Sequence, residues 1–567
     1  MSKSIKTALL WLLPLTFLGI FYFYPLGSIL KLSFSRSESG ALAPFLEAIQ
    51  SASIQKVFRF TIWQALLSTL LTLLIGLPGA HLLARYQFRG KTFFRAITGV
   101  PFVMPTLVVA AGFNALLGPK GWVNVTLMEI LNLSTPPIEF VNTLTAILVA
   151  HIFYNTTIVL RMVGDFWSHL DPRLSQAART LGANRWQVFR NITLPLLAPV
   201  ITAAALLVFI FDFTSFGVIL ILGGPHFATL EVEVYYQTIS LFNLPLAAVL
   251  SVLQLACTLV MTVAYTRLST RLSKPVALKS QQFTHKRLTT WRSRIHAGVV
   301  IGLLLILLAT PLLALAGQSV FSLENRRDRQ GEVTTGFTLD FYRLLGINQQ
   351  ESLFYTSPTT AIAISLGYAF ITVLLALLLG TPAAWALAHD QRSRANRLLD
   401  PILMLPLGTS AVTLGLGFIV ALAHPPLNMR ASPVLVPIAH TLVAFPFVIR
   451  SLTPALRSIQ PRLRQAAAIL GASPAQVFRH IDLPLIGRAL LVAATFAFTI
   501  SIGEFGATSL ISRPEFPTIP VVIYRFLSRP GGLNYGQALA LSTILMLVTA
   551  LGMLAIEKFR IADVGEF

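Results

Sequence analysis

Long apolar runs separated by short polar breaks limit what this chain can fold into. A run of about twenty apolar residues lets a helix cross the hydrocarbon core of a membrane, and the sequence contains about twelve such runs. Since 55% of the residues are hydrophobic and 11% are charged, the predicted fold class is an all-α polytopic membrane protein. The predicted spans lie near residues 8–32, 57–84, 93–117, 141–163, 195–222, 243–266, 296–321, 358–389, 398–423, 431–452, 485–511 and 536–557.

Lysine and arginine residues occupy every second break between these runs. The positive-inside rule places basic breaks in the cytoplasm, so we expect both termini to be cytoplasmic. The Lys and Arg residues that give the net charge of +21 are clustered in these breaks, so membrane lipid and not nucleic acid is the expected surrounding partner. The first run is much longer than the core of a signal peptide, and we expect it to be retained as a span. The basic breaks are residues 85–95, 173–190, 267–294, 392–397, 457–479 and 558–560.

One polar motif occurs twice at a fixed spacing. Every position of the second copy follows its equivalent by 465 − 176 = 289 residues. Upstream of the motif, Gly76 and Gly380 correspond at an offset of 304, and Pro101 and Pro406 at 305. The change of offset locates an insertion of 305 − 289 = 16 residues in the first half, around residues 118–140. The two copies of the motif are Gln176, Ala177, Ala178, Gly182, Leu194 and Pro195, and Gln465, Ala466, Ala467, Gly471, Leu483 and Pro484.

This repetition predicts two six-span halves with the same orientation, because each half has an even number of spans. The first repeat is expected at 1–266, with its duplicated loop at 171–195. A basic cytoplasmic linker follows at 267–295. The second repeat is expected at 296–567, with its loop at 460–484.

Each duplicated loop is predicted to form a helix, a glycine turn and a second short helix. Asp171 before Pro172 suits a capping residue followed by the first helical position. Gly182 is placed to end this helix in the left-handed conformation, and Asn184 to begin the next one. Such an element is rigid enough to transmit a force. A single loop of this kind is commonly a surface connector without a partner, but two copies with the same spacing favour a function.

At these residues the chain resembles the permease subunits of ATP-binding-cassette importers, whose cytoplasmic loop carries Glu-Ala-Ala, then Gly, then Ile-x-Leu-Pro. The resemblance implies the type I importer permease fold, a prokaryotic inner-membrane location and an external solute-binding protein. It also implies that both loops are ATPase-coupling elements. The chain departs from the family at Gln176 and Gln465, where Glu is usual, so a salt bridge to an ATPase arginine is lost.

The chain itself contains no GxxxxGK[ST] phosphate loop. We therefore expect ATP hydrolysis by a separate protein, present in two copies, one for each loop. No catalytic residues and no cofactor are predicted for this chain. Two further stretches, 215–237 and 501–524, are similar to segments of fused permeases for thiamine and for ferric iron. Permeases for phosphonate, sulfate and polyamines share parts of them, so these substrates remain alternatives.

Asp212 and Glu504 are acidic residues inside apolar runs, where a carboxylate normally faces a cavity or a partner. At the 289 offset, Glu504 matches Ser215, which lies about one helical turn after Asp212. One interpretation is that the acids line the translocation path and suit a cation. The other is that they accept hydrogen bonds from hydroxyls or backbone of a neighbouring span.

His151 and His440 are also repeat-related and lie within predicted spans. No Asp, Glu or Cys stands beside them at ligand spacing, so we expect interhelical hydrogen bonds and assign no metal site. The single cysteine, Cys257, excludes an intrachain disulfide.

A secondary transporter with two six-helix halves is the main alternative, because it has the same span count and pseudosymmetry. The duplicated loops argue against it, since such a carrier does not need a pair of helix–glycine–helix elements on one side. A membrane-embedded enzyme is a weaker alternative, because the sequence shows no constellation of His, Asp and Glu on a single face.

Overall fold

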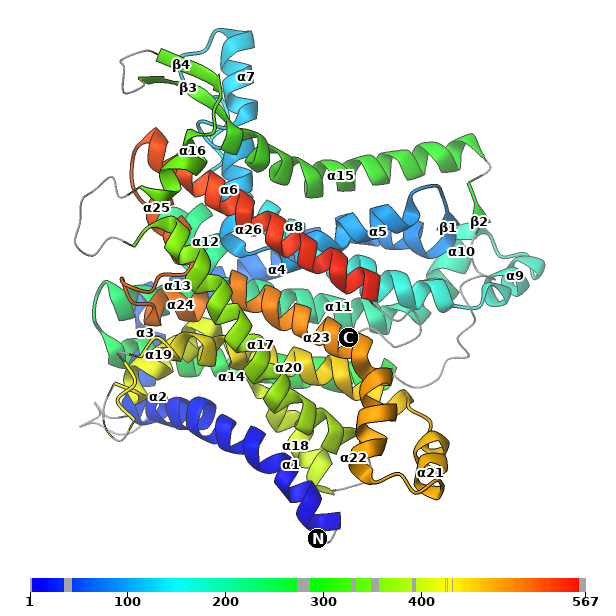
Figure 1. Ribbon diagram of the computed structural model, residues 1–567. Helices are drawn as coiled ribbons and strands as arrows, with labels where there is room; N and C mark the ends of the chain where they lie inside the picture. Colours follow the sequence, from blue (N-terminus) through cyan, green and yellow to red (C-terminus); the bar gives the residue numbers. More distant parts are fainter. Residues whose placement is uncertain are drawn as a thin grey trace. The chain divides into compact units, whose positions relative to one another are not determined.

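The computed structural model of this chain is built almost entirely from α-helices (Figure 1). Ten helical segments among the described residues are long and apolar enough to cross a membrane, and two bent pairs bring the number to twelve. The expected count of about twelve spans is therefore confirmed. The structure describes residues 3–34, 43–272, 286–288, 290–327, 333–347, 356–389, 394–423, 425, 427–430 and 432–559.

The elements of the first half of the chain end at α14, which runs beyond the predicted span to Leu272. They are α1 Lys3–Leu18, η1 Gly19–Phe23, α2 Tyr24–Phe34, α3 Ala43–Gln50, α4 Ala52–Arg85, β1 Tyr86–Gln87, α5 Lys91–Gly99, η2 Val100–Val103, α6 Thr106–Leu117, α7 Trp122–Leu131, α8 Leu144–His169, α9 Pro172–Thr180, α10 Arg185–Val188, η3 Phe189–Thr193, α11 Leu194–Phe213, α12 Gly217–Leu222, η4 Gly224–His226, α13 Leu230–Ile239 and α14 Leu244–Leu272.

The elements of the second half begin with the short strand β2 and the long helix α15. They are β2 Lys286–Arg287, α15 Trp291–Val320, β3 Phe321–Arg327, β4 Val333–Phe337, α16 Asp340–Arg343, η6 Leu344–Gly346, α17 Pro358–His389, α18 Arg394–Met404, η7 Leu405–Gly408, α19 Ala411–Ala421, α20 Leu435–Ser458, α21 Pro461–Ile469, α22 Pro474–Val477, η8 Phe478–Asp482, α23 Leu483–Gly503, α24 Gly506–Ile511, α25 Ile519–Leu527 and α26 Gly532–Phe559.

Strand β1 pairs in parallel with β2, and β3 pairs antiparallel with β4. The predicted linker at 267–295 is described only at its ends, because residues 273–285 and 289 lie outside the described residues.

Two of the predicted spans, near 93–117 and 398–423, are sharply bent. The helices before and after the bend meet at 109° in the first and at 95° in the second. Pro105 and Ser410, which correspond at the 305 offset, are the N-cap residues of α6 and α19. Pro105 has no N–H to continue the preceding helix, and the Ser410 hydroxyl accepts from the N–H groups of Val412 and Thr413 instead.

The described helices form two compact units, which do not coincide with the sequence repeats. Unit 1 comprises Met1–Ala48, Val234–Leu255 and Thr338–Phe567, and unit 2 comprises Ile49–Glu233 and Ala256–Phe337. Unit 1 thus joins the first span of the chain to most of the second repeat, and unit 2 joins α15 to most of the first. The repeat boundaries at 1–266 and 296–567 stay a prediction about the sequence.

Each unit contains the first span of the other repeat, and in both units this span is held by the same kind of glycine–proline contact. A Cβ atom on Gly112 of α6 would lie 2.9 Å from the carbonyl oxygen of Pro311 in α15. On Gly417 of α19 it would lie 3.0 Å from the Cβ of Pro25 in α2. Glycine is required at both positions because the backbone of one helix lies against the next. The two glycines are repeat equivalents, so each bent pair receives the first span of the other repeat.

The core of each unit is a bundle of three long helices. In unit 2, α4, α8 and α11 pack around Ala80, Val159 and Ala204, and in unit 1, α17, α20 and α23 pack around a corresponding cluster that includes Ala384 and Val448. These bundles position both the duplicated loops and the buried acids, because α11 and α23 carry a loop at one end and an acidic site at the other.

Candidate functional site: the duplicated loops and the buried carboxylates

The first duplicated loop has the predicted helix–glycine–helix geometry. The Asp171 carboxylate accepts a hydrogen bond of 2.9 Å from the N–H of Arg173 and so caps α9. Gly182 has φ +90°, its N–H donates to the Arg179 carbonyl, and the N–H of Ala183 donates to the Ala178 carbonyl. This pair of bonds is a Schellman motif, which requires the left-handed residue that glycine supplies.

The second loop repeats this geometry with different side chains. Gly471 has φ +83°, and the N–H groups of Gly471 and Ala472 donate to the Ala468 and Ala467 carbonyls. Ser473 and Gln476 form a capping box at the start of α22, as Asn184 and Gln187 do at the start of α10. The turn is therefore encoded in the local sequence of both loops, as predicted.

The second short helix of each loop continues directly into a span, which the sequence did not indicate. α10 runs through η3 into α11 as one helical segment, Arg185–Phe213, and α22 runs into α23 as Pro474–Gly503. Both joins are π-helical turns, in which the N–H of Leu194 donates to Phe189 and that of Leu483 to Phe478. Pro195 and Pro484 follow these turns, and a proline there cannot donate in the ordinary helical pattern.

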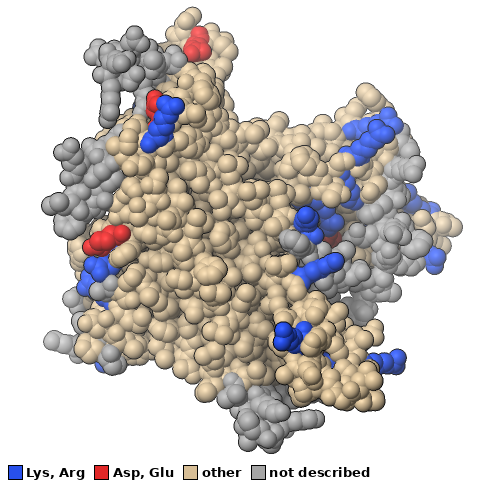
Figure 2. Space-filling model, viewed as in Figure 1, with Lys and Arg blue, Asp and Glu red and all other residues tan. Residues whose placement is uncertain are grey.

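Most of the loop surface is exposed. No residue of α9 or α21 is buried, and the side chains of Leu181 and Leu470 are 88% and 87% exposed. All of the predicted coupling residues are exposed except Ala178 and Ala467, which are half-buried. In Figure 2, lysine and arginine side chains lie around α9 and the start of α15 in unit 2 and also around α21 and α22 in unit 1, whereas the faces of the long helices are mostly uncharged. This end of unit 2 therefore exposes both polar and apolar side chains that a partner can contact.

Asp212 lies at the opposite end of α11 and is 1% exposed. Its Oδ1 atom accepts a 2.6 Å hydrogen bond from the Asn155 amide and lies 3.4 Å from Nδ1 of His151. The two ring nitrogens of His151 lie 3.0 Å from the Ser68 hydroxyl and 2.8 Å from the Ser215 hydroxyl. This cluster joins α4, α8 and the break after α11 within unit 2.

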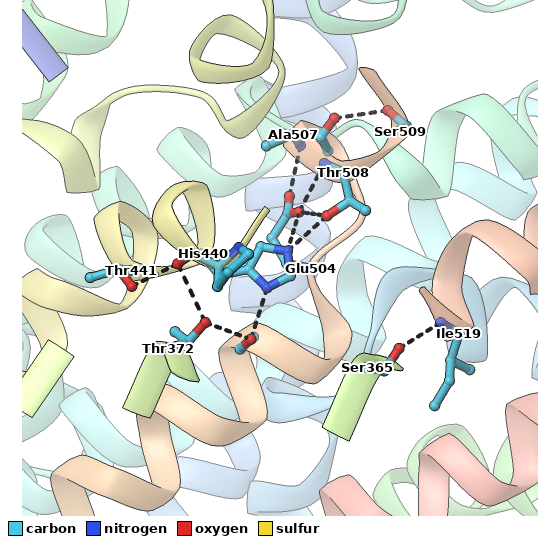
Figure 3. A network of polar contacts seen from close by, with 12 residues as sticks. Ser365, Thr372, His440, Thr441, Glu504, Ala507, Thr508, Ser509 and Ile519 are labelled. Atoms are coloured by element: carbon cyan, nitrogen blue, oxygen red, sulfur yellow. Dashed lines mark hydrogen bonds and ion pairs between the residues drawn. The ribbon is translucent and has the colours of Figure 1, made fainter. Parts of the chain in front are cut away.

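Glu504 follows the last residue of α23 and is 8% exposed (Figure 3). Its two oxygens accept from the N–H groups of Ala507 and Thr508 at 2.8 and 3.0 Å, and also from the Thr508 hydroxyl. Nε2 of His440 lies 3.3 Å from this carboxylate, and Nδ1 lies 2.8 Å from the Ser501 hydroxyl. Ser501 in turn donates to Thr372 of α17.

The histidines therefore make interhelical hydrogen bonds, as the sequence predicted. The acids were expected inside continuous spans, but they lie where α11 and α23 end. At these points the chain changes direction and continues into the short helices α12 and α24. Both acids accept hydrogen bonds, Asp212 from Asn155 of α8 and Glu504 from the helix that directly follows it, and the path-lining interpretation stays a prediction. Among the described residues no group of three His, Cys, Asp or Glu side chains could hold a metal ion.

Sequence reasoning missed Ser68, Thr372, Asn155 and Thr508. Ser68 and Thr372 could have been found from the sequence, because they correspond at the same offset of 304 residues as Gly76 and Gly380. A second missed pair is Thr61 and Ser365, whose hydroxyls accept from the N–H groups of Leu230 and Ile519 at the starts of α13 and α25; Figure 3 includes Ser365 and Ile519.

Comparison with known protein families agrees with this duplicated geometry. The family model "Binding-protein-dependent transport system inner membrane component" matches the chain twice, at residues 73–274 and 376–560. The matches cover more than half of the chain and include both duplicated loops. The chain belongs to that family. It is therefore a transport permease subunit of the inner membrane and not an enzyme, and its family works with an ATPase and a substrate-binding protein.

Curated relatives match the chain over nearly its whole length. The thiamine transport system permease protein ThiP of Escherichia coli K12 is 28% identical over 518 residues, covering 90% of both chains. ThiP of Brucella abortus (strain 2308) is 29% identical over 512 residues, covering 90% of this chain and 87% of the relative. ThiP of Haemophilus influenzae is 26% identical over 517 residues, covering 90% and 89%.

Proposed function

We propose that this chain forms the translocation path of a thiamine importer and couples it to two copies of a separate ATPase. The observation that carries the proposal is the pair of identical glycine turns, each fused through a π-turn to a membrane-spanning helix. Both termini and both loops then lie in the cytoplasm, and an external binding protein delivers the solute.

The mechanism rests on the continuity of each loop with its span. A partner that moves α9 moves α10 through the Schellman turn, and α10 continues through the π-turn into α11 as one helical segment. The segment from Arg185 to Asp212 is a rod of roughly 40 Å at 1.5 Å per residue. A displacement at the loop is thus transmitted along α11 to the break that holds the Asp212 cluster, and along α23 to the Glu504 cluster.

Thiamine is proposed as the solute because the relatives named for thiamine transport align along 90% of this chain. Ferric iron, the other solute considered from the sequence, has no support from these relatives. A cationic solute is compatible with the two acids, and we keep Asp212 and Glu504 as candidates for an electrostatic influence on the path.

Mechanical coupling is tested with Gly182→Val and Gly471→Val. A Cβ at either glycine meets no atom within 4 Å, so the cost comes only from the positive φ and is about 1 to 2 kcal/mol. We expect each variant to lose most ATP-driven uptake, and the double variant to lose the ATPase on purification. Gly90→Val is the matched control, because Gly90 has φ +81° in equally open space but lies outside the loops. Normal coupling in the double variant would contradict the proposal and favour a secondary transporter.

The solute is tested by uptake into proteoliposomes that contain the permease, its ATPase and the binding protein encoded with it. Labelled thiamine should accumulate in the compartment that faces the loops, and only when that compartment contains ATP. Ferric iron uptake without thiamine uptake would replace the solute and leave the coupling mechanism intact. For orientation, a cysteine at Gln460 should be labelled only from the cytoplasmic side, and one at Gln349, which lies outside the described residues, only from the external side.

A further inference from the structure

The tips of the two coupling loops share one backbone but carry different chemistry. Residues 179–186 read RTLGANRW and residues 468–475 read AILGASPA. The central Leu-Gly-Ala is identical, and both turns combine a Schellman motif with a capping box. Of the five positions that flank this core, two differ in charge: Arg179 and Arg185 correspond to Ala468 and Pro474.

The first tip is basic and aromatic. Arg179 and Arg185 flank the exposed Leu181, and both arginines are exposed. Neither makes an ion pair with a described residue of this chain. Trp186 is 65% exposed and stacks on Phe189 with 5.7 Å between ring centroids. Two exposed guanidinium groups are therefore available to form ion pairs with carboxylates of a partner.

The second tip is apolar and uncharged. Ala468 and Pro474 replace the two arginines, and Ile469, which is 85% exposed, replaces Thr180. With Leu470 it forms a pair of adjacent exposed aliphatic side chains. Such a surface gains affinity by being removed from water, a contribution that added salt does not screen.

The second loop is also braced against its own unit, and the first lacks this brace. Arg464 of α21 donates to Asp482 at 2.7 Å, and its guanidinium lies 5.4 Å from the Trp385 ring centroid. The repeat equivalents of these three residues are Ser175, Thr193 and His81, which cannot form an ion pair. The apolar tip is thus presented in a fixed orientation on α23.

We infer that the two loops bind the same ATPase by different forces, and this inference rests on the proposed function. The first loop binds carboxylates of the ATPase through Arg179 and Arg185, so its contact weakens with salt. The second loop binds through Ile469 and Leu470, so its contact does not. Raising the salt concentration then releases one ATPase copy before the other.

The test measures the ATPase stoichiometry of the purified complex in lipid nanodiscs by native mass, from about 0.05 M to about 0.5 M KCl. We expect two copies at low salt and one at high salt, with the dissociation constant at the first loop rising roughly tenfold or more over this range. A single cysteine at Gln176 or at Gln465, in a Cys257→Ser background, reports by cross-linking which loop has lost its partner.

Two variants make the inference falsifiable. Arg179→Gln with Arg185→Gln should leave one copy bound already at low salt, whereas the control Arg173→Gln with Arg462→Gln, altered once in each loop, should keep the order of release. Replacing residues 179–186 by AILGASPA, the sequence of the second tip, should abolish the salt dependence of ATPase binding at the first loop. Release of both copies at the same salt concentration, or unchanged salt dependence in these tip variants, would overturn the inference. Absence of any bound ATPase in the unmodified complex would overturn the proposed function itself.

Discussion

The two repeats bury one carboxylate each beside an equivalent histidine, but they place it on opposite sides of the imidazole ring. In unit 2 the acid is Asp212 on the Nδ1 side, and Ser215 is on the Nε2 side. In unit 1 the order is reversed, with Ser501 on the Nδ1 side and Glu504 on the Nε2 side. Since 501 − 289 = 212 and 504 − 289 = 215, acid and serine have exchanged positions between the repeats.

The exchange shows that a carboxylate and a serine hydroxyl flank the histidine in both repeats and that the fold does not fix which side each occupies. A second hydroxyl, from Ser68 or Thr508, also contacts each ring. The remaining partners have adapted to the choice. Asp212 requires Asn155, whose equivalent in the second repeat is Ala444. Glu504 instead receives N–H groups from the first turn of α24. The first carboxylate therefore depends more on its histidine than the second does.

The largest effect is expected for His151→Leu. This change removes the imidazole 3.4 Å from the buried Asp212 carboxylate, which keeps the 2.6 Å bond from the Asn155 amide. Leaving such a charged group without full compensation costs about 2 to 3 kcal/mol. His440→Leu should cost less, because Glu504 keeps its bonds from Ala507 and Thr508. Thermal melting of each purified variant, followed by size-exclusion chromatography, measures the difference. Equal destabilisation by the two substitutions would show that the repeats do not differ in this respect.

The next effect concerns the exchanged positions themselves. Asp212→Ser should reduce the amount of folded protein, and adding Ser215→Glu should restore part of it by recreating the order found in the second repeat. Restoration should be incomplete, because the equivalent of Thr508 is Ile219, which has no hydroxyl to donate. The yield of monodisperse protein at equal expression is the measurement. If the double variant gave no more monodisperse protein than Asp212→Ser, the side of the imidazole ring on which the acid lies would matter for folding.

A smaller effect is expected for Asp212→Asn and Glu504→Gln, which keep shape and remove charge. If the acids serve mainly as hydrogen-bond acceptors, the variants should lower the melting temperature while uptake per folded molecule stays normal. If they line the path, uptake of a cationic solute should fall at unchanged stability. Measuring both quantities on the same preparations separates these two interpretations.

The smallest effect is expected at the hydroxyls contributed by α4 and α17. Ser68→Ala removes a group 3.0 Å from the His151 ring and should cost about 1 kcal/mol. Thr372→Val should cost less, because the Thr372 hydroxyl bonds not to the histidine but to Ser501, at 3.1 Å, and to the Pro437 carbonyl at the longer distance of 3.4 Å. The melting temperatures of the two variants test this order, and a larger loss for Thr372→Val would contradict the assignment of partners.

Local features of the duplicated loops were predictable because their determinants lie within a few residues. A positive φ at Gly182 and Gly471 follows from helix ends that need a left-handed residue, and the capping side chains stand next to them. The continuity of α10 with α11 was not predictable, because a proline ordinarily marks a helix start. Here a π-turn before Pro195 accommodates the missing N–H without breaking the helix.

The sequence by itself determined the membrane class, the count of about twelve spans, the repeat and the geometry of the loops, because hydrophobic length, charge placement and turn chemistry are properties of short segments. Only the tertiary structure decided that the first span of each repeat packs with the other repeat, and that Asp212 meets His151, which lies 212 − 151 = 61 positions earlier in the chain. Those contacts depend on which helix faces meet, and the faces of these nearly uniformly apolar helices differ too little in sequence to specify their neighbours.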